Sequence, residues 1–157
     1  MPLIMRLPGE AEAGRRVAAL SQPIDLPATL LEAFGSRPPA MDGLSLLPWA
    51  KGKQGPIRPF SFSAWQMGDE MESALRTPDW KLIVPSNSSG QASVRDRQLY
   101  VKPEDRWEIN NVVQHHLELA DELEQKLQEF IKSDFTFSGE PLTSPLAPAP
   151  RSPEARG

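Results

Sequence analysis

The chain has 157 residues, a length typical of a single domain, with 17 prolines and a formal net charge of −4. It contains no cysteine, which excludes disulfides, thiolate zinc sites and cysteine nucleophiles within the chain. Its Lys and Arg residues are dispersed, and no apolar run approaches the length of about 18 residues that spans a bilayer. We therefore expect neither a nucleic-acid partner nor a membrane partner.

The N-terminal part predicts one strand and one helix. The run Pro2–Leu7 is almost continuously apolar, which is typical of a strand buried on both faces of a sheet. It is too short for a secretory signal, so no export signal is expected in this chain. The stretch Asp25–Gly35 predicts a helix with Asp25 as its N-cap. Pro27 fits its first turn and Gly35 fits the C′ position. The expected buried face consists of Leu26, Leu30, Leu31 and Phe34.

The middle of the chain predicts a sheet. It follows a turn-rich segment, residues 36–55, which Leu44, Leu46 and Leu47 are expected to anchor. Four runs beyond that segment predict strands, and their short connections indicate antiparallel pairing. The polar loop before the fourth run contains Ser86–Gly90. The predicted strands are Phe60–Gln66, Glu72–Thr77, Trp80–Val84 and Arg97–Lys102.

The last predicted element is a helix over Asn111–Lys132, capped by Asn110 or Asn111. Apolar residues recur along it at spacings of three and four, which predicts one stripe packed against the sheet. Trp65 and Trp80 are expected to lie between that helix and the sheet. Beyond the helix, the Pro- and Ser-rich composition predicts a disordered tail. The residues of the stripe are Val113, Leu117, Ala120, Leu123, Leu127, Phe130 and Ile131.

Four segments resemble sequence motifs that follow one another in the same order in one enzyme family. The last of them contains Leu99, Tyr100, Asp105, Glu108, Asn110 and Asn111, which match the pattern L-Y-D-L-x-x-D-P-x-E-x-x-N-L. In that pattern Val101 and Arg106 replace the usual Asp and Pro. The other segments are PLIMRLPG, then DLPATLLEAFG (compare D-L-x-P-T-L-L-D-x-x-G, here with the proline one place early), then MDGLSLLPW (compare D-G-x-S-L-L-P-L). Over Pro2–Ile131 the chain thus resembles the C-terminal part of a type I sulfatase, in the alkaline-phosphatase-like superfamily.

The resemblance implies an α+β fold in three parts. Residues 1–55, with the strand Pro2–Leu7 and the helix, would be a remnant of the large α/β sulfatase domain. Residues 56–133 would form a C-terminal subdomain, a four-stranded antiparallel sheet packed by the C-terminal helix. Residues 134–157 would be the disordered Pro-rich tail. The second part has its own stripe-on-sheet core and is expected to be able to fold alone.

The resemblance also implies that the groups that hydrolyse sulfuric esters lie upstream of Pro2–Leu7. These are the formylglycine made from Cys or Ser in C/S-x-P-x-R and the acids that bind calcium. Calcium and formylglycine are therefore expected only in a missing N-terminal portion, and no catalytic, cofactor-binding or metal-binding residue is assigned in this chain. Members of the family are often exported, so no localisation is predicted.

These expectations lead to three functional hypotheses. The first is a C-terminal sulfatase fragment that shapes the substrate cleft and is inactive alone. The second is a free-standing interaction module that binds a partner by strand addition at Pro2–Leu7. The third is one half of a split sulfatase, active only with a separately encoded N-terminal half.

A few residues are of types that could bind a substrate, a metal ion or a phosphate group. Arg76, Asp79 and Lys81 could line a substrate groove, although charged residues around a solvated turn are the favoured interpretation. His115 and His116 point about 100° apart if helical, so they offer at most one metal ligand, and polar surface positions are favoured. Ser86–Gly90 lacks the spacing and Lys of a phosphate-binding loop, so it is interpreted as a hairpin loop.

Overall fold

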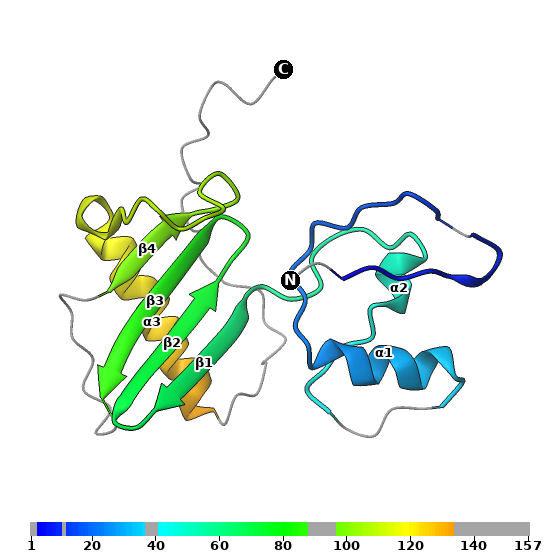
Figure 1. Cartoon of the computed structure of the whole chain (residues 1–157), viewed down its shortest axis with the longest axis horizontal. Helices are drawn as coiled ribbons and strands as arrows, with labels where there is room; N and C mark the ends of the chain where they lie inside the picture. The colour runs from blue at the N-terminus through cyan, green and yellow to red at the C-terminus, as the bar shows by residue number, and fades with distance from the viewer. Residues whose placement is uncertain (1–2, 11, 37–40, 88–96, 134–157) are drawn as a thin grey trace, which may run out of the picture. The chain divides into compact units, whose positions relative to one another are not determined.

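The computed structural model describes residues 3–10, 12–36, 41–87 and 97–133. The chain divides into two compact units, Met1–Arg58 (unit 1) and Pro59–Gly157 (unit 2), shown in Figure 1. The predicted tail, residues 134–157, and residues 88–90 of the predicted polar loop lie outside the described residues. No helix among the described residues is long and apolar enough to cross a membrane.

Unit 1 contains the predicted helix. This helix, α1, spans Asp25–Ala33, and Gly35 beyond its C-cap has φ 72°, a left-handed conformation that favours glycine. The amide of Gly35 donates to the carbonyl of Glu32 (3.0 Å), and that of Ser36 donates to the carbonyl of Leu31 (2.9 Å). These two bonds form the Schellman pattern that closes helix ends, so the predicted C-terminus is confirmed. The other helices of unit 1 are short: η1, Pro8–Glu10, and α2, Leu47–Ala50.

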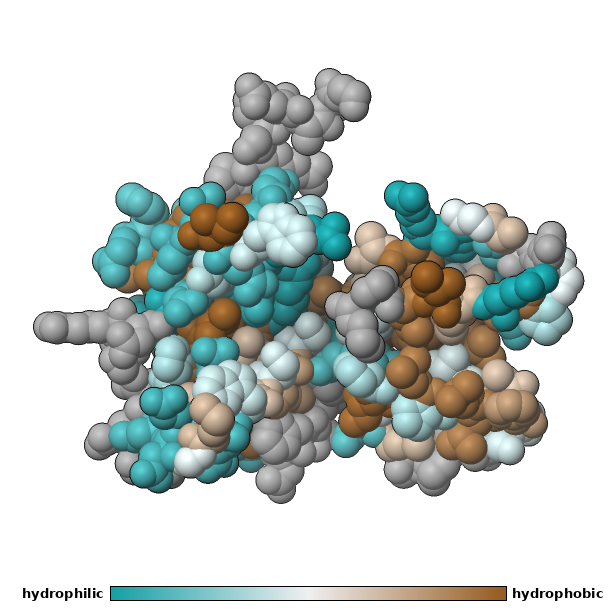
Figure 2. Space-filling view, viewed as in Figure 1, coloured by the Kyte–Doolittle hydropathy of each residue, from teal (hydrophilic) through white to brown (hydrophobic). Residues whose placement is uncertain are grey.

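The predicted buried face of α1 is wrong for this chain. The helix buries Asp25, Ala28 and Thr29, whereas Leu30 and Phe34 are 57% and 84% exposed. The reason is that Asp25 and Thr29 hydrogen-bond to the backbone of a neighbouring loop, which turns the polar side of α1 inward. Figure 2 shows hydrophobic side chains gathered on the visible face of unit 1. Of the apolar stripe of α1, Leu30 and Phe34 are therefore left uncovered by the described part of the chain, whereas Leu26 and Leu31 are partly buried.

The strand predicted at Pro2–Leu7 does not form over its described residues, 3–7. Leu3, Ile4 and Met5 are 46%, 90% and 40% exposed. A strand needs a neighbour that shares its backbone hydrogen bonds, and no described segment pairs with this one. The run has the composition of a buried strand, but no strand among the described residues pairs with it.

Unit 2 contains the predicted four-stranded antiparallel sheet, in the order β1-β2-β3-β4. Helix α3, Leu117–Lys132, packs on one face of this sheet (Figure 1). The α+β fold is therefore confirmed. The strands are β1 Ser61–Met67, β2 Glu70–Arg76, β3 Trp80–Asn87 and β4 Gln98–Val101.

The core of unit 2 lies between the sheet and α3. Phe130 of α3 contacts the rings of Phe60 and Phe62 at centroid distances of 5.2 and 5.4 Å. The predicted stripe is largely buried, but Leu117 at the start of α3 is 49% exposed. The buried core residues are Leu75, Trp80, Leu82, Val84, Leu99, Val113, Ala120, Leu123 and Leu127.

The last helix begins later than predicted. Asn111 precedes a 3-10 turn, η3 (Val113–His115), and α3 starts only at Leu117. The side-chain oxygen of Asn111 accepts from the amides of Leu99 (3.0 Å) and Val113 (3.1 Å). The side chain of Asn111 therefore ties the first residue of the 3-10 turn to β4, whereas the N-caps of η3 and α3 are Val112 and His116.

Candidate functional site

The first polar group of interest is the Asp25 cluster in unit 1: Asp25, Arg58, Gln22 and Thr29. The Asp25 side chain is fully buried, and its carboxylate pairs with the guanidinium of Arg58, which is also buried. The same carboxylate accepts from the amides of Gln22 (2.8 Å) and Leu44 (2.9 Å). The prediction that Asp25 is the N-cap is wrong, because Ile24 holds that position and Asp25 is the first helical residue.

Thr29 completes the attachment of α1 to the loop. Its hydroxyl donates to the carbonyl of Asp25 (2.6 Å) and accepts from the amide of Leu46 (2.9 Å). Leu46 and Leu47 are buried as predicted, whereas Leu44 is 43% exposed and is held through its backbone. The motifs DLPATLLEAFG and MDGLSLLPW are therefore held together by hydrogen bonds from the amides of Leu44 and Leu46 to the side chains of Asp25 and Thr29.

Gly43 is the tightest position in this attachment. A Cβ atom placed there would lie 2.0 Å from the carbonyl oxygen of Ile24, which is backbone and cannot move aside easily. We expect Gly43→Ala to destabilise unit 1 by about 1–3 kcal/mol, because it forces α1 and the loop apart. The measurement is urea unfolding with hydrogen exchange of the α1 amides as the probe. Gly55→Ala, which meets no atom within 4 Å but has φ 93°, measures backbone strain alone.

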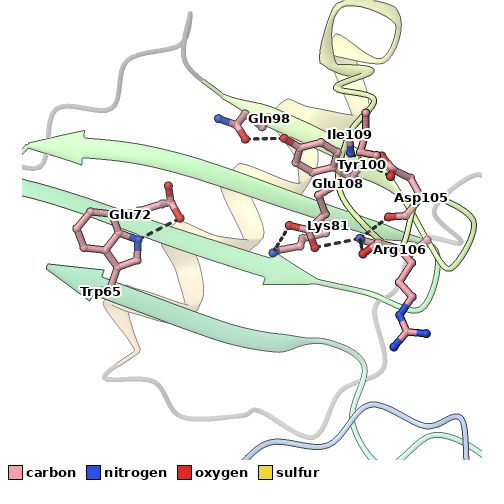
Figure 3. Close-up of polar contacts among 10 residues, drawn as sticks. Trp65, Glu72, Lys81, Gln98, Tyr100, Asp105, Arg106, Glu108 and Ile109 are labelled. Carbon is pink, nitrogen blue, oxygen red and sulfur yellow. Dashed lines mark hydrogen bonds and ion pairs between the residues drawn. The ribbon is translucent and has the colours of Figure 1, made fainter. Parts of the chain in front are cut away.

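The second group is the Glu108 cluster of unit 2: Lys81, Lys102, Asp105 and Glu108 (Figure 3). Glu108 has φ 59°, a conformation uncommon for residues other than glycine. One oxygen of its carboxylate lies 2.6 Å from Nζ of Lys81, and the other lies 3.0 Å from Nζ of Lys102. Lys102 is buried and also donates to the carbonyl of Asp105 (2.6 Å). Glu108 thus bridges β3 and the loop that follows β4.

Asp105 organises that loop from within. Its carboxylate accepts from the amides of Ile109 (3.0 Å) and Asn110 (2.9 Å). These bonds, first that from Ile109, hold the pKa of Asp105 below its ordinary value. Burial alone would raise the pKa of Glu108, but the hydrogen bonds from Lys81 and Lys102 outweigh it and lower that pKa. Both carboxylates are therefore in their charged form at neutral pH.

This arrangement makes the stability of unit 2 depend on pH. Because the folded-state pKa of Glu108 lies below its usual value of 4.5, its stabilisation is complete above that pH and is lost as pH falls through the lowered pKa. We expect Glu108→Gln to cost about 1–3 kcal/mol at pH 7 and to flatten the acid limb of a plot of unfolding free energy against pH. Part of the acid limb should remain in Glu108→Gln, because the pKa of Asp105 is also lowered in the folded state. An unchanged acid limb in Glu108→Gln would show that the pair does not stabilise the fold.

The predicted groove residues are only partly brought together. Arg76 and Lys81 are register partners on β2 and β3, so they lie side by side on the sheet face opposite α3. Burial lowers the pKa of Arg76, although the charges of Glu108 and Asp79 oppose that effect. Asp79 lies in the turn between the strands and accepts the amide of Lys102 through its backbone carbonyl (2.7 Å).

The other candidates take structural positions. His116 precedes α3 and packs on the Trp80 ring at a centroid distance of 5.1 Å, while His115 ends the 3-10 turn. Ser86 belongs to β3 rather than to a loop. Trp80 lies between sheet and helix as predicted, but the same prediction for Trp65 is wrong. Trp65 lies on the opposite face and is 47% exposed, because it alternates with Phe62 along β1.

Two buried arginines were missed. Arg97, 4% exposed, binds Asp121 and Glu124 of α3 at 2.7 Å each and ties the start of β4 to the helix. Burial disfavours its charge, but the two carboxylates raise the pKa of Arg97 above its ordinary value. Arg58 pairs with Asp25 across a large separation in sequence. No local pattern marks such long-range pairs, so sequence reasoning had no signal for either.

The described residues do not fit a calcium site. Calcium takes six or more oxygen ligands, several of them carboxylates. Within ranges 3–10, 12–36, 41–87 and 97–133, no group of three or more His, Asp or Glu side chains could hold a metal ion. The carboxylate of Asp25 instead pairs with Arg58, and that of Glu108 pairs with Lys81 and Lys102.

Comparison with known proteins identifies the domain. Residues 1–133 match the family model described as N-sulphoglucosamine sulphohydrolase, C-terminal. A solved structure of a candidate sulfatase from Bacteroides thetaiotaomicron has 25% identity and a TM-score of 0.58 over 69% of this chain. A structure titled as a 2-O GAG sulfatase has 25% identity and a TM-score of 0.57 over the same share. No curated protein matches the chain.

This chain spans 24% of the length of each of those two solved sulfatases. The Asp25 and Glu108 clusters account for the motifs that carry the resemblance, from DLPATLLEAFG to the loop after β4. The chain belongs to the family of N-sulphoglucosamine sulphohydrolase C-terminal domains.

Proposed function

We propose that this chain is the structural, cleft-shaping C-terminal part of a sulfatase that acts on a sulfated sugar, and that it has no sulfuric ester hydrolase activity alone. The observation that carries the proposal is the use of the matched motif residues. The carboxylates of Asp25, Asp105 and Glu108 bind backbone amides, Arg58 and lysines. Carboxylates bound in this way support a scaffold role, and these three are not free to act as a general base or a nucleophile. The sugar class follows from the family description and from the 2-O GAG sulfatase.

The catalytic portion would lie outside these 157 residues. We propose that calcium and the formylglycine nucleophile belong to that portion, which would be the partner of this chain. The length relation supports this, because the two solved sulfatases are about four times as long as the part matched here. The uncovered stripe of α1 and the exposed residues Leu3–Met5 supply apolar surface for such a partner to bury.

A split enzyme, or a free-standing module that binds another protein, remains as the second candidate. The exposure of Ile4 and Phe34 favours these arrangements, because a bound partner would remove this apolar surface from water. The coding sequence next to Met1 separates the two arrangements. An adjacent gene for a sulfatase catalytic portion favours the split enzyme, and unrelated sequence favours the free-standing module.

The test is turnover by the purified 157-residue chain with an aryl sulfate and calcium. We expect no release of sulfate above the buffer blank, because the formylglycine nucleophile is proposed to belong to the separate catalytic portion. A preparation with Glu108→Gln serves as the control for a contaminating sulfatase, since contamination would persist in both. Turnover by the wild-type chain that this variant abolishes would overturn the proposal.

A further inference from the structure

Arg76 differs from three other partly or fully buried cations of unit 2. Lys81, Lys102 and Arg97 each contact at least one carboxylate at 3.0 Å or less. Arg76 is only partly exposed, yet among the described residues its side chain makes neither a hydrogen bond nor an ion pair. A partly buried guanidinium normally recovers its lost hydration from hydrogen-bond acceptors. The guanidinium donors of Arg76 are therefore available to bind an anion.

Arg76 lies in a row of side chains that crosses one face of the sheet. The residue lies on the sheet face opposite α3, in the row Ser61, Arg76, Lys81 and Tyr100 across the four strands. Glu108 and Asp79 act on it at longer range, but Glu108 is already bound by Lys81 and Lys102. Five donors in a planar fork suit a sulfate or carboxylate group better than a lone ammonium would.

The same sheet face carries an exposed aromatic ring. The indole nitrogen of Trp65 donates to the carboxylate of Glu72 across the strand pair (3.1 Å), which fixes the ring against β2 (Figure 3). Glu72 lies four residues before Arg76 on the same strand, a separation of about 14 Å between backbone positions. On β4, at the other edge of the same sheet face, the phenol of Tyr100 donates to the side-chain oxygen of Gln98 (2.6 Å).

We propose that this face binds a sulfated oligosaccharide, with Trp65 stacking on a sugar ring and Arg76 holding a sulfate group. The inference rests on the proposed function and adds to it the residues that would contact the sugar. A fixed tryptophan presents a flat apolar surface suited to the C–H face of a sugar, while Gln98 offers hydrogen bonds to hydroxyls. A span of about 14 Å fits several linked sugars rather than one.

The experiment is isothermal titration of the full chain with a heparin tetrasaccharide, with the fully desulfated tetrasaccharide, and with sodium sulfate. We expect binding of the first only, and a loss of about tenfold in affinity for both Arg76→Met and Trp65→Ala. Matched controls are Lys126→Met, on α3 at the other face of the sheet, and Phe34→Ala, an exposed ring of unit 1. Both controls should keep the affinity of the wild-type chain.

Several outcomes would overturn the inference. They are no binding of the tetrasaccharide by the wild-type chain, equal binding of sodium sulfate, and equal losses in Lys126→Met and Arg76→Met. If Arg76→Met does not fold, Arg76→Lys keeps the charge without the fork and should still weaken binding. The indole N–H signal of Trp65 in an NMR titration should shift with the tetrasaccharide, and an unmoved signal counts against the inference. Tetrasaccharide binding that Arg76→Met leaves intact would mean that Arg76 does not hold a sulfate group. The turnover test of the proposed function is independent of all these results.

Discussion

Replacing Asp25 by alanine should unfold α1 and the loop that it holds. The side chain is 0% exposed and neutralises Arg58, whose side chain is 2% exposed. Removal of one partner leaves the other as an uncompensated buried charge, which costs about 3–5 kcal/mol. The amides of Gln22 and Leu44 lose their acceptor as well. We expect fast hydrogen exchange of the α1 amides in Asp25→Ala, while the amides of β2 and β3 stay protected.

Glu32→Ala is the matched control for this variant. Glu32 lies on α1 but is exposed, so its loss should change unfolding free energy by about 0.5 kcal/mol or less. Asp25→Asn keeps the shape of the side chain and removes only its charge. If Asp25→Asn and Asp25→Ala both leave α1 protected, the buried pair does not hold unit 1 together.

The second large effect is expected in the core of unit 2. Leu123 is 0% exposed at the centre of α3 and packs in the cluster that contains Leu82 and Leu99. Leu123→Ala should lower the unfolding free energy by about 2–5 kcal/mol, through lost transfer energy and the cavity left behind. Urea unfolding followed by tryptophan fluorescence, to which Trp80 of the same core contributes, measures this change.

Leu117→Ala makes the same chemical change on the same helix at a side chain that is 49% exposed. Its cost should stay at about 0.5 kcal/mol or less. Equal costs for the two variants would mean that α3 does not pack on the sheet through the predicted stripe.

The sheet and α3 could be predicted because both follow local periodicity. Residues at spacings of three and four, such as Leu123 and Leu127, give one stripe, and short turns leave only antiparallel pairing. The parity of β1 also contained the correct side for Trp65, because Ser61 and Ser63 share its face and Phe62 does not. The general tendency of tryptophan to be buried predicts the opposite side, and here the alternation along β1 decides.

The clusters could not be predicted in detail because they depend on distant residues. Asp25 reads as an N-cap in its own segment, and only the folded chain brings Arg58 and the amide of Leu44 to it. In the same way Glu108 meets Lys81 from another strand. The family motifs contain these residues, but a motif alone does not distinguish a residue that stabilises the fold from one that takes part in catalysis.

We propose that this chain is one part of a larger sulfatase fold, and no strand among the described residues pairs with the apolar run 3–7. Native-state hydrogen exchange of the full chain, shown to be monomeric by sedimentation, tests this proposal. We expect unprotected amides at Leu3–Leu7 beside strongly protected amides in β3. Strong protection of Leu3–Leu7 in the monomer would contradict it.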